Sequence, residues 1–243
     1  MCIRDSVNSI QCTLKAIYRY GERTHGLKKL DFNVIKFSQK SKTKEPLTLE
    51  KEMIIWQYCL NNKERISLAM SLGLYAGLRI GEICALKWED IDLENSMISI
   101  TKTVQRLKSE NHEQKTQLYI LEPKSTSSIR SVILPDFLTE YLKKYNDLYN
   151  KDFFILSNKE IPVDPRIIQK NFRKICKAND IDATFHTLRH TYATNCIKTN
   201  IDVKTLSETL GHANVNITLN RYVHTSLDFK KQQINKIEPP IKP

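Results

Sequence analysis

The stretch TFHTLRHTYAT, residues 184–194, combines the spacing of a half-buried helix with an unusual number of basic side chains. His186 and Arg189 are three residues apart and His190 follows His186 by one turn, so the three would share a helix face. Taken alone, this pattern is more typical of a satisfied histidine and a solvated arginine than of a site. A zinc motif is disfavoured, because Thr187 replaces the glutamate of HExxH and the sequence shows no third ligand.

The segments around this helix predict a mainly helical, mixed α/β domain with a small antiparallel sheet. Helical spacing is found in LEKEMIIWQYCLNN, in ERISLAMSLGLYAG, which Gly77 is placed to end, and in the shorter RIGEICALKW. Strands are predicted for SMISITK, QLYILE and RSVILP, and the polar PKSTSSI between the last two predicts a hairpin. FFILS (153–157) is expected to be extended or buried, and further helices are predicted over 135–149, 164–178, 186–199, 202–210 and 215–224.

The charge balance favours a polyanionic partner. The chain has 38 Lys+Arg against 27 Asp+Glu, a formal net charge of +11, and 40% hydrophobic residues, which is enough for a core. The basic residues are spread along the sequence rather than gathered in one tail, which favours a broad binding surface. They include Lys42, Lys44, Lys87, Lys102, Lys108, Lys124, Arg130, Arg166, Lys170, Arg173, Lys174 and Lys177.

Cysteine usage and hydropathy favour a cytoplasmic protein, associated with the nucleoid if its partner is DNA. No apolar run reaches the ~18 residues of a membrane helix, and no signal-peptide core is found.

The acidic EDIDLE (89–94) is interpreted as a solvated turn rather than a Mg²⁺ site, because its carboxylates alternate with Ile91 and Leu93. No metal or cofactor is predicted. No CxxC pair is present, and reduced thiols are expected at Cys2, Cys12, Cys59, Cys84, Cys176 and Cys196.

Two other segments carry candidate site residues. Arg79 lies between two glycines where one helix stops and another starts, so its side chain is expected to project from a turn. Glu82, three residues on, is placed to hold the guanidinium in one rotamer, although the alternative is an exposed ion pair of little energetic value. Lys124 opens the predicted turn PKSTSSIRS, where a lysine is usually a solvated charge.

The segment LGHANVNITLNRYVH, residues 210–224, holds the remaining candidates. Gly211 is placed to end a helix, and His212 follows it directly. Tyr222 lies ten residues after His212, near the end of the next predicted helix. Considered alone, Tyr222 would be interpreted as a partly buried aromatic residue.

In this order, the candidates resemble the catalytic set of the tyrosine recombinases, the phage-integrase-type site-specific recombinases. The matching segments are GLRIGEICALKWEDID, PKSTSSIRSVILP, HTLRHTYATNCI and LGHANVNITLNRYVH, and the likeness covers roughly residues 46–228. It implies a catalytic domain that wraps around double-stranded DNA. The implied function is integration and excision of a phage or other mobile element. A tyrosine would attack a DNA phosphodiester to give a 3′-phosphotyrosyl bond, and a strand of the partner duplex would reverse the step.

The resemblance implies four groups that act on the reacting bonds. Tyr222 would be the nucleophile, and ionising a tyrosine at pH 7 costs about 4 kcal/mol. Arg79 and Arg189 would stabilise the charge on the phosphate without a metal. Lys124 would be the general acid that protonates the leaving 5′-oxygen.

Four more residues receive roles from the same resemblance. His186 would assist the tyrosine proton or bind a phosphate oxygen, and His212 would hydrogen-bond the same phosphate. Glu82 would orient Arg79, and His190 would supply supporting hydrogen bonds.

The sequence also predicts how the chain is divided. MCIRDS matches the translation of a transposon end used as a sequencing adaptor, so residues 1–6 are expected to be read-through and the protein truncated at its N-terminus. Thr48 is the expected N-cap that follows a linker. Residues 7–39 are expected to be a remnant of a helical core-binding domain, with a helix over SIQCTLKAIYRYGERT followed by a short helix or loop. The other expected parts are the linker (40–47), the catalytic domain that breaks and rejoins DNA (48–228) and a C-terminal helix or tail (229–243).

The expected assembly is a homotetramer on DNA that is monomeric in solution. Recombination needs four protomers on two duplexes, and the amphipathic SLDFKKQQINKI (226–237) is expected to dock on a neighbour. Accessory directionality factors are a further expected partner.

Two alternative functions stay open at the level of sequence. A type IB topoisomerase would use similar residues to relax supercoils, although LGHANVNITLNRY argues against it. A non-catalytic DNA-binding protein, or a decayed remnant of a mobile element, is the alternative from a different class.

Overall fold

The computed structural model describes residues 3–28, 45–109, 115–123, 126–146 and 150–222, which belong to two compact units, 1–43 and 44–243. The described part of the first unit is the helix α1 (Ile3–His25), which confirms the helix predicted there. Tyr18 donates a hydrogen bond from its hydroxyl to the carbonyl of Lys28 at 2.6 Å, just beyond the end of this helix. The short helix or loop expected up to residue 39, and most of the predicted linker, lie outside the described residues.

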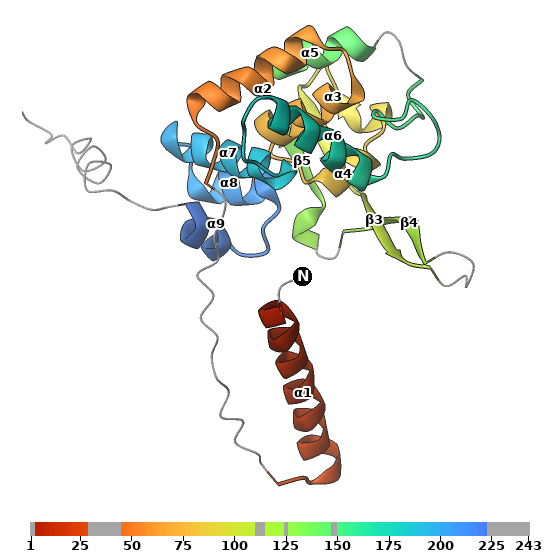
Figure 1. The fold of residues 1–243 in the computed structure, drawn as a ribbon, viewed down its shortest axis with the longest axis vertical. Coiled ribbons are helices and arrows are strands. Elements are labelled where there is room, and N and C mark those ends of the chain that lie inside the picture. The colour runs from red at the N-terminus through yellow and green to blue at the C-terminus, as the bar shows by residue number, and fades with distance from the viewer. Residues whose placement is uncertain (1–2, 29–44, 110–114, 124–125, 147–149, 223–243) are drawn as a thin grey trace, which may run out of the picture. The chain divides into compact units, whose positions relative to one another are not determined.

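The second unit is mainly helical, as predicted, and its core surrounds α3. Residues 66–74 of α3 are all buried, and α3 packs against α2, α4, α5, α6 and α7. Figure 1 shows α7 and α8 on one side of this core and the β3–β4 pair on the other. The helices are α2 (Leu49–Asn61), α3 (Arg65–Tyr75), α4 (Ile80–Ala85), α5 (Asp136–Asn146), α6 (Pro165–Ala178), α7 (Phe185–Lys198), α8 (Val203–Leu210) and α9 (Val215–Tyr222).

Local signals explain where several of these helices begin and end. Thr48 caps α2 as predicted, because its side chain accepts from the amide of Lys51. Asp164 caps α6, which begins with proline in the first turn. Gly77 has a φ of +65° just after α3, and a Cβ there would clash with the ring of Tyr192. Glycine therefore ends α3 where the sequence predicted it.

The strand pairing differs from the prediction. A three-stranded antiparallel sheet has the order β1 (Ile91–Asp92), β2 (Met97–Ile100), β5 (Arg130–Ile133). A separate antiparallel pair is formed by β3 (Thr103–Lys108) and β4 (Thr116–Leu121). The hairpin predicted between QLYILE and RSVILP is therefore wrong, because β4 and β5 belong to different sheets.

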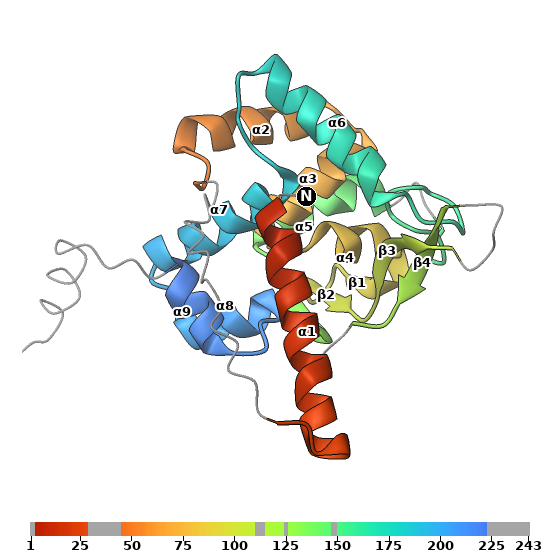
Figure 2. The ribbon, with the colours of Figure 1, turned by 60° about the horizontal axis from the view of Figure 1, so that its bottom comes forward.

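Burial explains this pairing. Ile98 of β2 lies opposite Val132 of β5, and both side chains are fully buried in the core. In β4, by contrast, Ile120 is exposed, although its partner Val104 in β3 is buried. A strand joins the sheet in which its apolar face is covered, so β5 pairs with β2. Figure 2 shows the β3–β4 pair beside α4, at the end of the unit away from α8 and α9.

Two smaller predictions are also met. FFILS is buried from Phe154 to Ser157, although its backbone forms turns and isolated bridges rather than a strand. The acidic segment 89–94 forms a turn into a strand, in which Asp92 accepts from the amides of Glu94 and Asn95.

The described cysteines are all free thiols, and four of the five are buried. Desolvation raises the pKa of Cys59 and of Cys84 to about 12. These two thiols therefore stay protonated at neutral pH, as expected for core residues. In the part of the chain with described coordinates, no helix combines the length and the apolar character needed to cross a membrane.

Candidate functional site

Arg79 is held by Glu82 at the start of α4, as the sequence predicted. The Arg79 amide donates to Oε2 of Glu82 at 2.8 Å, and Nη1 donates to Oε1 at 2.7 Å. Glu82 is only 5% exposed, whereas the Arg79 side chain is 38% exposed. The pair is therefore not the exposed surface contact of the alternative interpretation, since a buried carboxylate fixes an arginine that still reaches the surface.

Arg130 completes this group and was not among the site residues predicted from the sequence. Its Nη1 and Nη2 donate to the two carboxylate oxygens of Glu82 at 3.1 and 3.0 Å, and its side chain is 6% exposed. The sequence signal that could have identified Arg130 is the alternation of inward-facing and outward-facing side chains in the strand RSVI. Arg130 lies on the same face of β5 as the fully buried Val132, and a charge on an inward face needs a partner.

The pKa of the Glu82 carboxyl is lowered. Burial alone would raise its pKa, but the hydrogen bonds and positive charge of Arg130, followed by the charge of Arg79, outweigh the desolvation. Glu82 is therefore a carboxylate shared by two guanidiniums.

Arg189 is 2% exposed, so the alternative of a solvated arginine on this helix is wrong. Its Nη1 donates to the carbonyl of Gly77 at 2.7 Å and its Nη2 to the carbonyl of Leu210 at 2.6 Å. Helix α7 lies against α3, and this places the guanidinium inside the unit, between the end of α3 and the end of α8.

The turn after α8 joins the two arginines. Gly211 has a φ of +62°, which L-residues with a side chain rarely adopt, and its carbonyl accepts from Nη2 of Arg79 at 3.1 Å. The preceding carbonyl, that of Leu210, accepts from Arg189. Two guanidiniums that come from distant segments therefore converge on two adjacent peptide groups.

His212 belongs to the same turn. Its Nε2 lies 3.2 Å from Nη2 of Arg189, and its Nδ1 lies 2.8 Å from Oγ1 of Thr218 in α9. The structure thus brings Arg79, Glu82, Arg189 and His212 together as one site.

His186 and His190 lie at the start of α7, with ring centroids 5.1 Å apart and ring planes at 90°. His186 is exposed, whereas His190 is 9% exposed. The predicted common face is thus divided, because the helix turns His186 towards the surface and buries Arg189 and His190.

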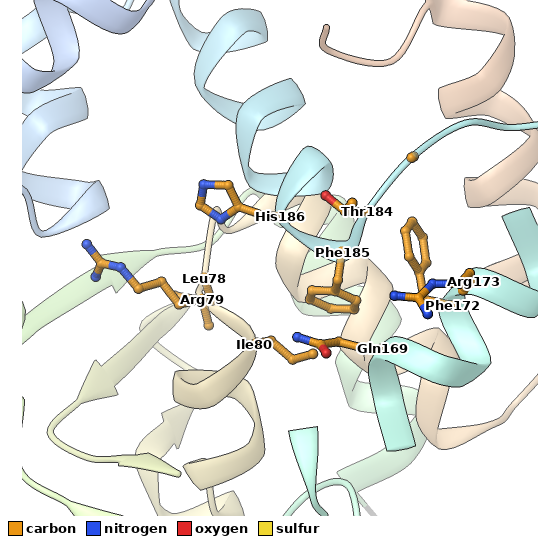
Figure 3. Close-up of a pocket in the computed structure, with 10 residues that line it drawn as sticks. Leu78, Arg79, Ile80, Gln169, Phe172, Arg173, Thr184, Phe185 and His186 are labelled. Carbon is orange, nitrogen blue, oxygen red and sulfur yellow. The ribbon is translucent and has the colours of Figure 1, made fainter. Parts of the chain in front are cut away.

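A cavity of about 290 Å³ opens beside Arg79 and His186. Figure 3 shows Arg79 and His186 on one side of it, and Gln169 and Arg173 of α6 on the other. Apolar side chains line the space between them, namely Leu78, Ile80, Phe172, Ala183 and Phe185.

Of the predicted site residues, Tyr222 is described only in its backbone, and Lys124 is not described. Tyr222 is the last residue of α9, one turn after Thr218. The Tyr222 side chain and the whole of Lys124 lie outside the described residues. The segment that follows Lys124 does pass the site, because a Cβ on Gly211 would lie 3.1 Å from the carbonyl oxygen of Ser127.

A model of the phage integrase family matches residues 46–228 of this chain. The chain is 31% identical to a tyrosine recombinase XerC-like protein of Caldanaerobacter subterraneus subsp. tengcongensis, over 72% of this chain and 48% of that protein. It is 32% identical to transposase A from transposon Tn554 of Staphylococcus aureus, over 84% of this chain and 55% of that protein. The chain thus spans about half the length of these relatives.

The fold is similar to that of solved integrases and recombinases. The Tn1549 transposon integrase, solved in complex with transposon right end DNA, superimposes with a TM-score of 0.80 at 22% identity, over 96% of this chain and 79% of that one. The XerA recombinase superimposes with a TM-score of 0.60 at 24% identity, over 81% of this chain and 66% of that one. These structures confirm the predicted fold class.

Proposed function

The chain belongs to the phage integrase family, and we propose that it is a site-specific recombinase that cleaves and rejoins double-stranded DNA through a 3′-phosphotyrosyl intermediate. The observation that carries this proposal is the convergence of Arg79 and Arg189 on the Leu210–Gly211 turn. Two guanidiniums held by adjacent peptide groups suit one phosphate group, which presents two non-bridging oxygens.

The phosphate would compete with protein carbonyls for these donors. Nη2 of Arg79 donates to the Gly211 carbonyl, and the Arg79 side chain is more exposed than that of Arg189. A phosphate oxygen carries more negative charge than a carbonyl oxygen, so it is the stronger acceptor. The buried contacts of Arg189 keep its guanidinium in place before DNA arrives, so little reorganisation is needed as charge develops on the phosphorus.

Tyr222 is the proposed nucleophile and Lys124 the proposed general acid. The phenolic oxygen of Tyr222 forms a bond to phosphorus, the bond from phosphorus to the 5′-oxygen breaks, and Lys124 transfers a proton to that oxygen. A 5′-hydroxyl of the partner duplex then attacks the phosphotyrosine, which releases Tyr222. One phosphodiester-type bond replaces another in each step, so no high-energy cofactor is consumed.

The other predicted residues support this chemistry. His186, exposed beside Arg79, would take the tyrosine proton or bind a phosphate oxygen. His212 would bind the same phosphate from the turn that both arginines contact. Glu82 orients Arg79, and the buried His190 would support His186, whose ring it contacts.

The DNA surface would include α6, which borders the cavity. Its basic residues are exposed and recur at helical spacing, so they can contact successive phosphates beside the cleavage site. The five are Arg166, Lys170, Arg173, Lys174 and Lys177.

Four copies on two duplexes are the proposed active assembly, formed by docking of segment 226–237 on a neighbour. This segment lies outside the described residues, as does the C-terminal helix or tail expected over 229–243. Integration and excision of a phage or other mobile element, with accessory directionality factors, is the proposed biological setting.

A nicked suicide substrate tests the function. The duplex carries the repeat that flanks the encoding element, with a nick placed so that the short 5′-hydroxyl strand diffuses away after cleavage. A recombinase should then accumulate as a covalent protein–DNA adduct that survives denaturation. Binding without an adduct would instead support the DNA-binding alternative, and relaxation of supercoils without any target sequence would support the topoisomerase alternative.

A further inference from the structure

Three consecutive carbonyls at the end of α8 each accept from a different arginine. Thr209 accepts from Nε of Arg130 at 2.6 Å, Leu210 from Arg189 and Gly211 from Arg79. The C-terminal end of a helix carries partial negative charge and unpaired carbonyls, so it suits such cations. Two of these arginines have proposed roles on the phosphate, and the third has none so far.

We propose that Arg130 is a positioning residue, which does not touch DNA but holds Glu82, and through it Arg79, and fixes the turn on which both phosphate-binding arginines converge. This inference rests on the proposed function. The Arg130 side chain is 6% exposed, its Nε and both Nη atoms donate to protein oxygens, and its charge is paired with the buried Glu82 carboxylate. A phosphate could reach Arg130 only by displacing this charged, bidentate carboxylate, whereas at Arg189 it would displace neutral carbonyls.

The charges in this group show what Arg130 does for Arg79. A single carboxylate, Glu82, lies between two guanidiniums, so the group of three has a net charge of +1. Without Arg130, Glu82 and Arg79 would form a neutral pair, and the carboxylate would compete more strongly with DNA for the guanidinium. Arg130 makes the bidentate contact and is the stronger cause of the lowered Glu82 pKa, so it leaves the charge of Arg79 available.

The same guanidinium also fixes the turn. A Cβ added to Gly211 would lie 2.9 Å from Nη1 of Arg130. The absence of a side chain at Gly211 therefore leaves room for the Arg130 guanidinium to pack against this turn. Nη1 also donates to the carbonyl of Ser128 at 3.1 Å. Arg130 therefore joins α4, the end of α8 and the segment that follows Lys124 in one contact set.

The test compares Arg130→Met and Arg130→Lys with Arg106→Met as a matched control. Arg106 also pairs with a carboxylate, Asp164, but at the start of α6, away from the turn. Single-turnover adduct formation on the nicked substrate, the Kd for intact DNA and the melting temperature are measured for the 243-residue chain. We expect Arg130→Met to slow adduct formation about 100-fold, as for loss of one preorganised donor, with the Kd changed by less than about threefold. Arg130→Lys should fall between Arg130→Met and wild type, and Arg106→Met should cleave at nearly the wild-type rate.

A double-mutant cycle separates positioning from a purely structural role. If Arg130 acts through Arg79, the double variant with Arg79→Ala and Arg130→Met should lose much less of the rate of adduct formation than the product of the two single-variant losses. Multiplicative effects, or Arg130→Met cleaving at the wild-type rate, would overturn the inference. The inference would also be overturned if the Arg130→Met chain failed to fold while the Arg130→Lys chain kept full activity. A wild-type chain that forms no adduct would instead overturn the proposed function, and this inference with it.

Discussion

Nε2 of His212 lies 3.2 Å from Nη2 of Arg189, so one nitrogen of this ring contacts a guanidinium of the site. Nδ1 of the same ring lies 2.8 Å from Oγ1 of Thr218, so the second ring nitrogen contacts α9. Thr218 is fully buried in α9, the helix that ends at Tyr222. The proposed phosphate-binding histidine is therefore connected to the helix that carries the proposed nucleophile.

Replacing Thr218 with valine tests this connection. The change keeps the shape of the side chain but removes the hydrogen-bond partner of Nδ1, so the His212 ring is no longer held by α9. We expect adduct formation to slow by about 3- to 10-fold, the equivalent of one neutral hydrogen bond of about 1 kcal/mol. Thr205→Val, on the exposed side of α8, is a suitable control. Equal rates for Thr218→Val and wild type would show that the contact does not matter for cleavage.

Tyr222→Phe should bind DNA with an unchanged Kd and form no covalent adduct, because it lacks only the attacking oxygen. A gel shift measures the Kd, and denaturing electrophoresis of the suicide substrate detects the adduct. Tyr119→Phe, on β4, controls for the loss of a tyrosine hydroxyl elsewhere. An adduct of wild-type yield with Tyr222→Phe would remove this residue as the nucleophile.

Arg189→Lys should lower both stability and activity, since lysine keeps the charge but loses the fork that reaches Gly77 and Leu210. Leaving one buried carbonyl without its donor costs about 1–3 kcal/mol in the free energy of unfolding. We expect adduct formation to fall about 100-fold, measured at a temperature where denaturant titration shows the variant to be folded. A rate within a few-fold of wild type would exclude Arg189 from phosphate stabilisation.

Gly211→Ala should disturb the site more than it disturbs the fold. A φ of +62° costs a residue with a Cβ about 1–2 kcal/mol, and the added methyl would lie 2.9 Å from Nη1 of Arg130. We expect a modest loss in melting temperature and a larger, at least tenfold, loss in adduct formation. Gly26→Ala, which has a φ of +62° with no atom within 4 Å, gives the backbone cost alone. Similar activities for the two variants would contradict the prediction.

Glu82→Gln should change how stability depends on pH. A carboxyl whose pKa is lowered on folding stabilises the native state above its unfolded pKa of about 4.3, and this contribution is lost as the pH falls through the folded pKa. The free energy of unfolding of the wild type should therefore fall more steeply than that of Glu82→Gln as the pH decreases from about 5 to 3. Denaturant titrations across this range give both slopes, and parallel curves would contradict the shared-carboxylate description.

Much of this molecule was predictable from local patterns. The helices of the second unit follow from apolar spacing, and the Thr48 cap and the Gly77 stop follow from local backbone chemistry. The pairing of Glu82 with Arg79 was also predicted, because residues three apart at the start of a helix contact each other. Local patterns failed for the strands. QLYILE and RSVILP are close in sequence and separated by turn residues, but the pairing was decided by which strand could cover Val132.

The sequence by itself determined the family, the helices of the second unit and the identity of the proposed catalytic groups, because these depend on residue type and on short spacings. Only the tertiary structure decided that Arg189 is buried, that His186 and His190 face different surroundings, and that Arg130 belongs to the site. The physical reason is that a guanidinium is stabilised by the acceptors around it. At the end of α8, those acceptors are three successive carbonyls that receive arginines from β5, from α7 and from the turn before α4, and no local pattern brings these segments together.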